Sequence, residues 1–151
     1  MNELLLMTHV LLGVGCLMAS LWIFVEVLHV NETNVARIRC LSRSVAVVMW
    51  LAFLVGGYWY VMLYPADKAI ILKGPWPFSH NFFMETKEHL VIMLLLLTNY
   101  LPIAAANNLV ASRDARKLVL AVAGLIVLLA LAMEGEGAFI AMGVKVALLP
   151  K

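Results

Sequence analysis

Four long apolar runs constrain the fold of this chain more than any other feature of its sequence. Each approaches the roughly 20 residues that a helix needs to cross a hydrocarbon core about 30 Å thick. Inside such a core the backbone N–H and C=O groups must be satisfied within the helix itself. Since 64% of the residues are hydrophobic and only 13% are charged, we expect one all-α membrane domain over residues 1–151. The runs cover about Leu4 to Val30, Val45 to Tyr64, His89 to Ala106 and Leu118 to Met133, the last extendable through Phe139.

The distribution of arginine and lysine predicts how these spans are oriented. Arg37, Arg39 and Arg43 lie between the first and second runs, and Arg113 and Arg116 lie between the third and fourth. By the positive-inside rule both connections face the cytoplasm, so both termini face outward. The first run has no basic segment before it and no small-residue cleavage site at its end, so we expect it to be retained rather than removed as a signal peptide.

Loop lengths predict the arrangement of the spans. The two arginine-containing connections are short, which makes consecutive spans antiparallel neighbours in an up-down-up-down four-helix bundle. The connection over residues 65–88 is long and faces outward, and its prolines and aromatic residues suit the headgroup layer. A net charge of +2 spread over several loops does not form the basic stripe of a nucleic-acid-binding protein.

Ionisable residues inside membrane spans face a bundle interior or a cavity by default, which makes them the candidate functional residues. At 3.6 residues per turn, His9, Gly13, Cys16 and Ser20 share one face of the first span, and His29 points nearly the opposite way. The small residues beside His9 leave space for a flat ligand. They also suit plain close packing of helices, and the sequence does not decide between the two.

The third span offers a histidine at the depth of His9. His89 begins this span, which runs parallel to the first, and diagonal helices of a bundle can present such residues to each other. His9 and His89 therefore form a candidate pair of axial ligands for haem iron. The alternative is that each histidine is hydrogen-bonded to a neighbour, such as Glu85 in the case of His89.

Carboxylates supply a second hypothesis, a site for a divalent cation or a proton. Glu134 is predicted to point into the bundle at the depth of His89, whereas Glu136, turned about 200° away on the helix, is expected to reach solvent as an interfacial charge. Glu85, Glu88, His89 and Glu134 then form an alternative cluster for a non-haem divalent metal. Glu26 and His29 lie at the other end of the first span, too far away to share it.

The first hundred or so residues carry a pattern of histidine, tryptophan, glycine and lysine positions. The pattern consists of His9, Trp22, His29, Gly56, Gly57, Trp59, Lys87 and His89. It resembles small bacterial four-helix membrane haem proteins, which include the HemJ type protoporphyrinogen oxidases and the CopD-like domains. The resemblance implies a multi-pass protein of a bacterial inner membrane that binds haem b.

We therefore expect a b-type haem protein in electron transfer, with His9 and His89 as axial ligands and Lys87 near a haem propionate. Such a protein needs a quinone or a redox protein as partner, or a place in a larger membrane complex. If it is an enzyme, we expect an oxidoreductase. The alternatives are a cation-binding or proton-relay transporter that uses the Glu/His cluster, and a cofactor-free assembly factor. The sequence assigns no role to His29 or His80.

Overall fold

The computed structural model describes residues 2–149, and every regular element in that range is helical. Among the described residues, four stretches are long and apolar enough to cross a membrane: Glu3–Leu28, Val35–Met62, Ser79–Ala105 and Arg113–Ala147. This confirms the four predicted spans. The elements are α1 (Asn2–Leu28), α2 (Val35–Met62), α3 (Tyr64–Lys73), the π-helical turn η1 (Ser79–Met84), α4 (Glu85–Ala105) and α5 (Arg113–Ala147).

The outward faces of the long helices are apolar. Leu11, Leu54, Leu96 and Leu128, one from each long helix, are all at least 60% exposed. A helix that is hydrophobic on all sides is typical of a protein core or a membrane span. Since these leucines do not lie in the protein core, the outer surface suits lipid.

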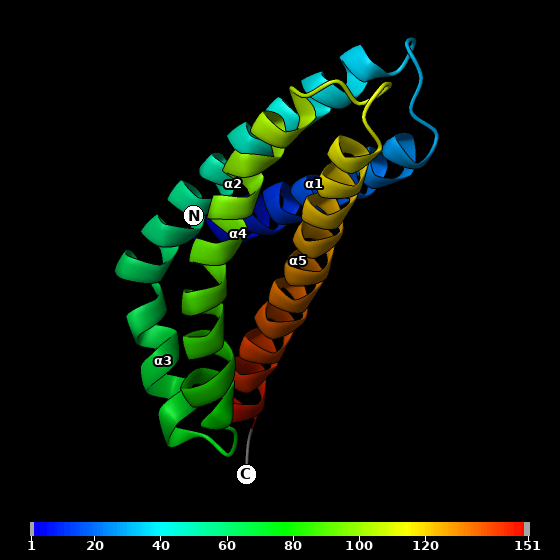
Figure 1. The fold of residues 1–151 in the computed structure, drawn as a ribbon. Helices are drawn as coiled ribbons and strands as arrows, with labels where there is room; N and C mark the ends of the chain where they lie inside the picture. The colour runs from blue at the N-terminus through cyan, green and yellow to red at the C-terminus, as the bar shows by residue number, and fades with distance from the viewer. Residues whose placement is uncertain (1, 150–151) are drawn as a thin grey trace.

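The four long helices form a closed ring. α1 packs against α2 and α5, and α4 packs against the same two helices. α1 and α4 therefore face each other along one diagonal, as predicted, and α2 and α5 along the other. Figure 1 shows the ring from one side, with α1 behind and α2, α4 and α5 in front.

The two ends of the ring differ. At one end, called here the arginine end, Arg39 near the start of α2 donates from Nε to the carbonyl of Ala105 at 3.2 Å and from Nη2 to those of Ala106 and Asn107 at 3.3 and 3.2 Å. These carbonyls end α4, where the helix dipole favours a cation. At the opposite end, called the α3 end, α3 and η1 pack against the last turns of α5 (Figure 1).

The connection between the second and third spans is mostly helical, so the prediction of a long loop over residues 65–88 was wrong. Pro65 lies in the first turn of α3, where a proline needs no hydrogen-bonded N–H. Pro75 and Pro77 bracket the short irregular stretch that separates α3 from η1. The third span therefore begins at Ser79, ten residues before the expected start at His89.

α5 is longer than the fourth apolar run. It begins directly after its N-cap residue Ser112, whose side chain accepts a hydrogen bond from the backbone N–H of Ala115 at 3.2 Å. It continues through Gly135 and Gly137 to Ala147, a total of 35 residues, or about 52 Å at 1.5 Å per residue. Its last turns pack against α3 and η1. These contacts stabilise α5 beyond Gly135 and Gly137, where the glycines alone would weaken the helix.

The core consists of two apolar clusters. The main cluster joins all four long helices and on α5 ends at Met133. The aromatic cluster lies at the α3 end, where Tyr64, Ile71, Met84 and Ile140 pack with Trp59, Tyr60 and Phe83. Residues between Met133 and Ile140 on α5, and just after Met84 on α4, therefore lie between the two clusters.

Candidate functional site

A small cavity in the interior of the ring lies where the main cluster gives way to the aromatic cluster. Its volume is about 40 Å³, which is enough for at least one water molecule, since a cavity of roughly 10–15 Å³ already holds one. Most of the lining is apolar. Each long helix contributes three residues: His9, Gly13 and Cys16 from α1, Met49, Ala52 and Phe53 from α2, Lys87, Val91 and Leu94 from α4, and Ala130, Met133 and Glu134 from α5.

Three ionisable side chains line this cavity, and they come from three different helices. They are His9 of α1, Lys87 of α4 and Glu134 of α5. The inward direction of His9 and of Glu134 was predicted from helical angles, and the structure confirms both. Lys87 was predicted to lie near a bound haem, and the structure places it directly opposite α1 across the ring.

Each of these three side chains lies against a glycine of a neighbouring helix. A Cβ atom added to Gly56 of α2 would lie 2.5 Å from Cε1 and Nδ1 of His9. A Cβ atom on Gly13 of α1 would overlap the Oε1 atom of Glu134, and one on Gly137 of α5 would lie 3.0 Å from Nζ of Lys87. The glycines therefore provide the space that the ionisable side chains occupy.

Neighbouring glycines show that this pairing is specific. Gly15, Gly57 and Gly135 lie on the same helices, two, one and two residues away from Gly13, Gly56 and Gly137. A Cβ atom on any of these three would meet nothing within 4 Å. Close helix packing alone does not explain why Gly13, Gly56 and Gly137 each contact an ionisable group.

A backbone hydrogen bond orients the His9 ring. Its Nδ1 atom lies 2.9 Å from the carbonyl oxygen of Ala52. Since a carbonyl can only accept, Nδ1 carries the proton, and in the neutral ring Nε2 is left as an acceptor. His9 thereby offers the cavity a nitrogen that can take up a proton or bind a ligand.

Lys87 is the one cation among the described residues that line the cavity, and it shares the lining with the carboxylate of Glu134. Glu136, a second buried carboxylate, lies two residues further along α5. Across residues 2–149 the only direct ion pairs join Arg37 to Glu26 and Lys117 to Asp114, so Lys87 does not contact either carboxylate directly.

Glu136 corrects a sequence prediction. We expected it to reach solvent, but it is only 9% exposed, and its buried Oε2 atom has no hydrogen-bond partner among the described residues. The angular argument assumed that α5 has one buried side. In fact α1 covers one side of α5 while α4 and η1 cover another, so residues 200° apart are both enclosed.

His89 lies away from this cavity. It is exposed on α4, and its Nδ1 atom is 2.6 Å from the carbonyl oxygen of Glu85. The structure therefore brings His9 together with Lys87 and Glu134 but does not bring His9 and His89 to one cavity. The bond to Glu85 is the neighbour contact that the sequence left open as the alternative.

The expected cation cluster is also dispersed. Glu85 and Glu88 are exposed, and Glu88 accepts a hydrogen bond from the phenol of Tyr60 at 2.5 Å. Glu134 lies inside the ring, apart from both. In the described part of the chain no group of three or more His, Cys, Asp or Glu side chains is placed to hold a metal ion.

Glu26, near the end of α1, stabilises the turn that connects α1 to α2. The Glu26 carboxylate pairs with Nε of Arg37 at 2.9 Å and accepts from the Asn34 amide at 2.8 Å and the Trp22 indole at 3.0 Å. These partners connect the end of α1 to the start of α2. His29 follows in the same turn and is exposed.

Sequence reasoning missed a second buried polar group at the α3 end. His80 is 4% exposed, and its Nδ1 atom is hydrogen-bonded to the phenol of Tyr64 at 2.9 Å. Burial raises the pKa of Tyr64, so its phenol stays protonated at neutral pH. The signal in the sequence was a histidine among aromatic residues, Phe78 to Phe83, which we had placed in the headgroup layer.

Comparison of the chain with protein-family models, with curated proteins and with solved structures finds no match. The functional argument therefore depends on the geometry of the site.

Proposed function

We propose that this protein is a multi-pass membrane protein whose interior site binds and passes on a proton, as part of a proton-relay or proton-coupled transport function. The observation that carries the proposal is the placement of His9, Lys87 and Glu134 around one water-sized cavity, each against a glycine. Ionisable groups inside a membrane span are costly to keep and mark ion or proton pathways.

The charge balance of the site supports the exchange of one proton. Lys87 contributes one positive charge, and Glu134 and Glu136 contribute two negative charges when both are ionised. With a neutral His9, the group as a whole becomes neutral when it takes up one proton. Since an unbalanced charge is expensive away from water, the buried group favours one bound proton. Glu134 and Nε2 of His9, which belong to side chains that line the same cavity, are the groups that could hold it.

The same proposal gives the protein an orientation. The arginine end faces the cytoplasm of a bacterial inner membrane, and the α3 end and both termini face outward, as the positive-inside rule predicts. Exposed lysines at the two ends allow a test. In a protein that carries Cys16→Ser and Cys40→Ser, Lys117→Cys should react with a membrane-impermeant maleimide only after permeabilisation, and Lys68→Cys should react in intact cells. The reverse pattern would invert the orientation.

Proton uptake into proteoliposomes tests the function. The purified protein is reconstituted into vesicles that contain a pH-sensitive dye, and a potassium gradient with valinomycin sets an inside-negative potential. Wild-type vesicles should acidify faster than empty vesicles, and Glu134→Gln and Lys87→Met should reduce the rate to that of empty vesicles. These changes remove the exchangeable proton and its countercharge.

The matched control is Glu88→Gln, which removes a carboxylate from the same end of the bundle but from its exposed surface. It should leave the rate of acidification unchanged. If wild-type protein acidifies no faster than empty vesicles, or if Glu88→Gln lowers the rate as much as Glu134→Gln, the site does not relay protons.

Haem binding is the second candidate, and the orientation of His9 favours it. Histidines that bind metals usually donate their other ring N–H to a carbonyl or carboxylate, as Nδ1 of His9 does to Ala52. His9 would then hold the iron through Nε2, with Lys87 beside a propionate. Pockets for cofactors measure about 300–1,000 Å³, so the 40 Å³ cavity would have to widen greatly.

A haem would supply one-electron transfer, and the protein would then need a quinone, a redox protein or a larger membrane complex around it. A reduced-minus-oxidised absorption spectrum of the purified protein tests this candidate. A Soret band that His9→Ala abolishes would support it. His89→Ala should leave the band unchanged if His9 holds the haem in this cavity without His89, and should abolish the band if His9 and His89 are the axial pair.

A further inference from the structure

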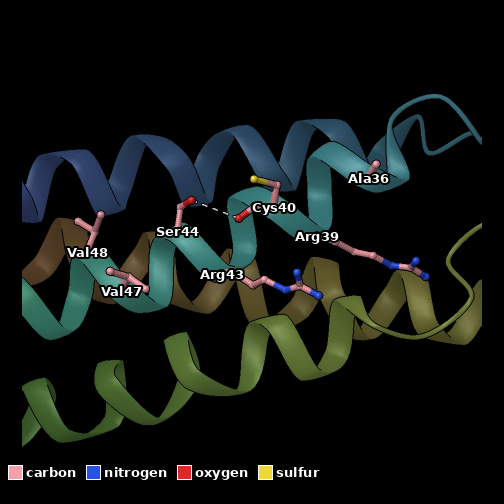
Figure 2. A pocket seen from close by; sticks show the side chains of 7 residues that line it. All are labelled: Ala36, Arg39, Cys40, Arg43, Ser44, Val47 and Val48. Carbon is pink, nitrogen blue, oxygen red and sulfur yellow. Dashed lines mark hydrogen bonds between the residues drawn. The ribbon is translucent and has the colours of Figure 1, made fainter.

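A groove runs along one face of α2 at the arginine end. Its lining includes Arg39 and Arg43, then Val47 and Val48 one turn further along the helix. The space beside these residues, about 580 Å³, is shallow and open to the surroundings, and all of its lining residues belong to α2. Figure 2 shows both guanidinium groups directed toward the end of α2 at which Ala36 lies, with the valines at the other end of the groove.

The two arginines differ in how much binding capacity they retain. Arg39 is partly buried, and its Nε and Nη2 atoms already donate to the carbonyls that end α4. Arg43 is exposed and, among residues 2–149, has no ion pair and no side-chain hydrogen bond. All of its donors are therefore free for an external acceptor, with Arg39 fixed one turn away.

The order of polar and apolar residues along the groove matches the order within a lipid. Guanidinium groups bind phosphate oxygens through paired N–H donors. Val47 and Val48 lie one turn further into the span, where an acyl chain would follow the headgroup. Val47 is 59% exposed, so its surface is free for such a contact.

We propose that this groove binds an anionic phospholipid, with the phosphate at Arg43 and Arg39 and one acyl chain along Val47 and Val48. Basic residues next to the end of a span attract anionic headgroups. Arg43 brings an unpaired guanidinium to the groove, and Arg39, which is held by the carbonyls at the end of α4, adds a second positive charge one turn away.

Trp50 provides a reporter for this site. It lies on α2 one turn beyond Val47, is 44% exposed, and its indole donates to Asn99 at 3.1 Å. In a variant with Phe at Trp22, Trp59 and Trp76, only Trp50 fluoresces. Phosphatidylglycerol or phosphatidylcholine with brominated acyl chains is then mixed into vesicles that carry the protein, and quenching of Trp50 measures occupancy of the groove.

Brominated phosphatidylglycerol should quench Trp50 at a lower mole fraction than brominated phosphatidylcholine does. Arg43→Gln should reduce this preference by more than the roughly fivefold expected for any one arginine at a membrane surface, and Arg43→Lys should retain part of it. Arg113→Gln is the matched control, because Arg113 is exposed at the same end but outside the groove.

Equal quenching by the two lipids would overturn the proposal. So would an equal loss of preference in Arg43→Gln and Arg113→Gln, since it would indicate general surface attraction. Circular dichroism checks that both variants keep their helices. The proposal is independent of proton transfer, because His9, Lys87 and Glu134 are unchanged in all of these proteins.

Discussion

The two halves of the helix ring are built on different principles. The half toward the arginine end is filled by aliphatic side chains such as Ile38, Leu101, Val119 and Ile126, all fully buried. The half toward the α3 end encloses His9, Lys87, Glu134 and Glu136, and beyond them Tyr64 and His80. The first half holds the helices together, while the second positions groups that can exchange protons.

Glycine shows the difference most clearly. In the apolar half, a Cβ atom on Gly124 would lie 3.4 Å from the Phe24 ring, an ordinary packing distance. In the polar half, a Cβ atom on Gly13 or Gly56 would collide with Glu134 or His9. The polar half therefore depends on residues without side chains to make space for its ionisable groups, and the apolar half does not.

The largest effect on stability should come from the apolar half. Leu101 is 0% exposed, so Leu101→Ala should lower the free energy of unfolding by about 2–5 kcal/mol through lost burial and a new cavity. Unfolding in mixed micelles measures this loss. The rate of proton uptake per folded protein should not change. A large loss of that rate with intact folding would mean that the halves are not separate in function.

Gly56→Ala should have the next largest effect. The added methyl group meets the rigid ring of His9 and its bond to Ala52, so one of them must move, at a cost of about 1–3 kcal/mol. Proton uptake should fall sharply. Gly57→Ala, the adjacent position with an open surface, should instead leave uptake intact and stabilise the helix by up to about 1 kcal/mol. Similar behaviour of the two variants would show that His9 is not held as described.

Tyr64→Phe tests the outermost polar pair. It removes the phenol and leaves Nδ1 of the buried His80 without its partner, which should cost about 1–3 kcal/mol. The measurement is the unfolding midpoint, with Tyr58→Phe as the exposed control. No difference between the two would mean that the Tyr64 and His80 bond contributes nothing to the α3 end.

The smallest effect should come from Gly137→Ala. Its Cβ atom would lie 3.0 Å from the end of the flexible Lys87 side chain, which can shift by a few tenths of an ångström. We expect near-neutral stability but a slower proton uptake, because the ammonium moves relative to Glu134. Gly135→Ala, which meets nothing within 4 Å, should leave the uptake rate unchanged. A slower rate in Gly135→Ala would point to helix rigidity instead of the position of Lys87.

The sequence predicted the spans because hydropathy and length determine them without knowledge of tertiary contacts. The inward faces of α1 and α5 also followed from helical angles, which placed His9 and Glu134 correctly. Angles alone could not show whether Lys87 or His89 faces the interior. These two residues lie about 200° apart on a helix, and only the packing of α4 between α2 and α5 fixes its rotation.

Two other features depend on contacts between distant segments. Glu136 is buried although its helical angle predicted a solvent-facing position, since α5 packs against α1, α3, α4 and η1 and not against a single neighbour. The sequence did not predict α3 and η1, because prolines and aromatic residues in a connection suggest a loop. Pro65 instead occupies the first turn of a helix. The role of Gly56 could not be predicted, since Gly56 makes space for the ring of His9, which lies 47 positions earlier in the chain.

A double-mutant cycle between Lys87 and Glu134 tests the central claim most directly, that these charges share one site inside the ring. Unfolding free energies are measured for Lys87→Met, Glu134→Leu and the double variant. We predict that the double variant is more stable than the sum of the single losses implies, with a coupling of about 1–3 kcal/mol, because Lys87→Met leaves Glu134 without a nearby cation and this penalty disappears when Glu134 is also removed. His89→Leu combined with Glu134→Leu should be additive, since His89 is exposed. Additive losses for Lys87 and Glu134, or stronger coupling to His89, would contradict the account.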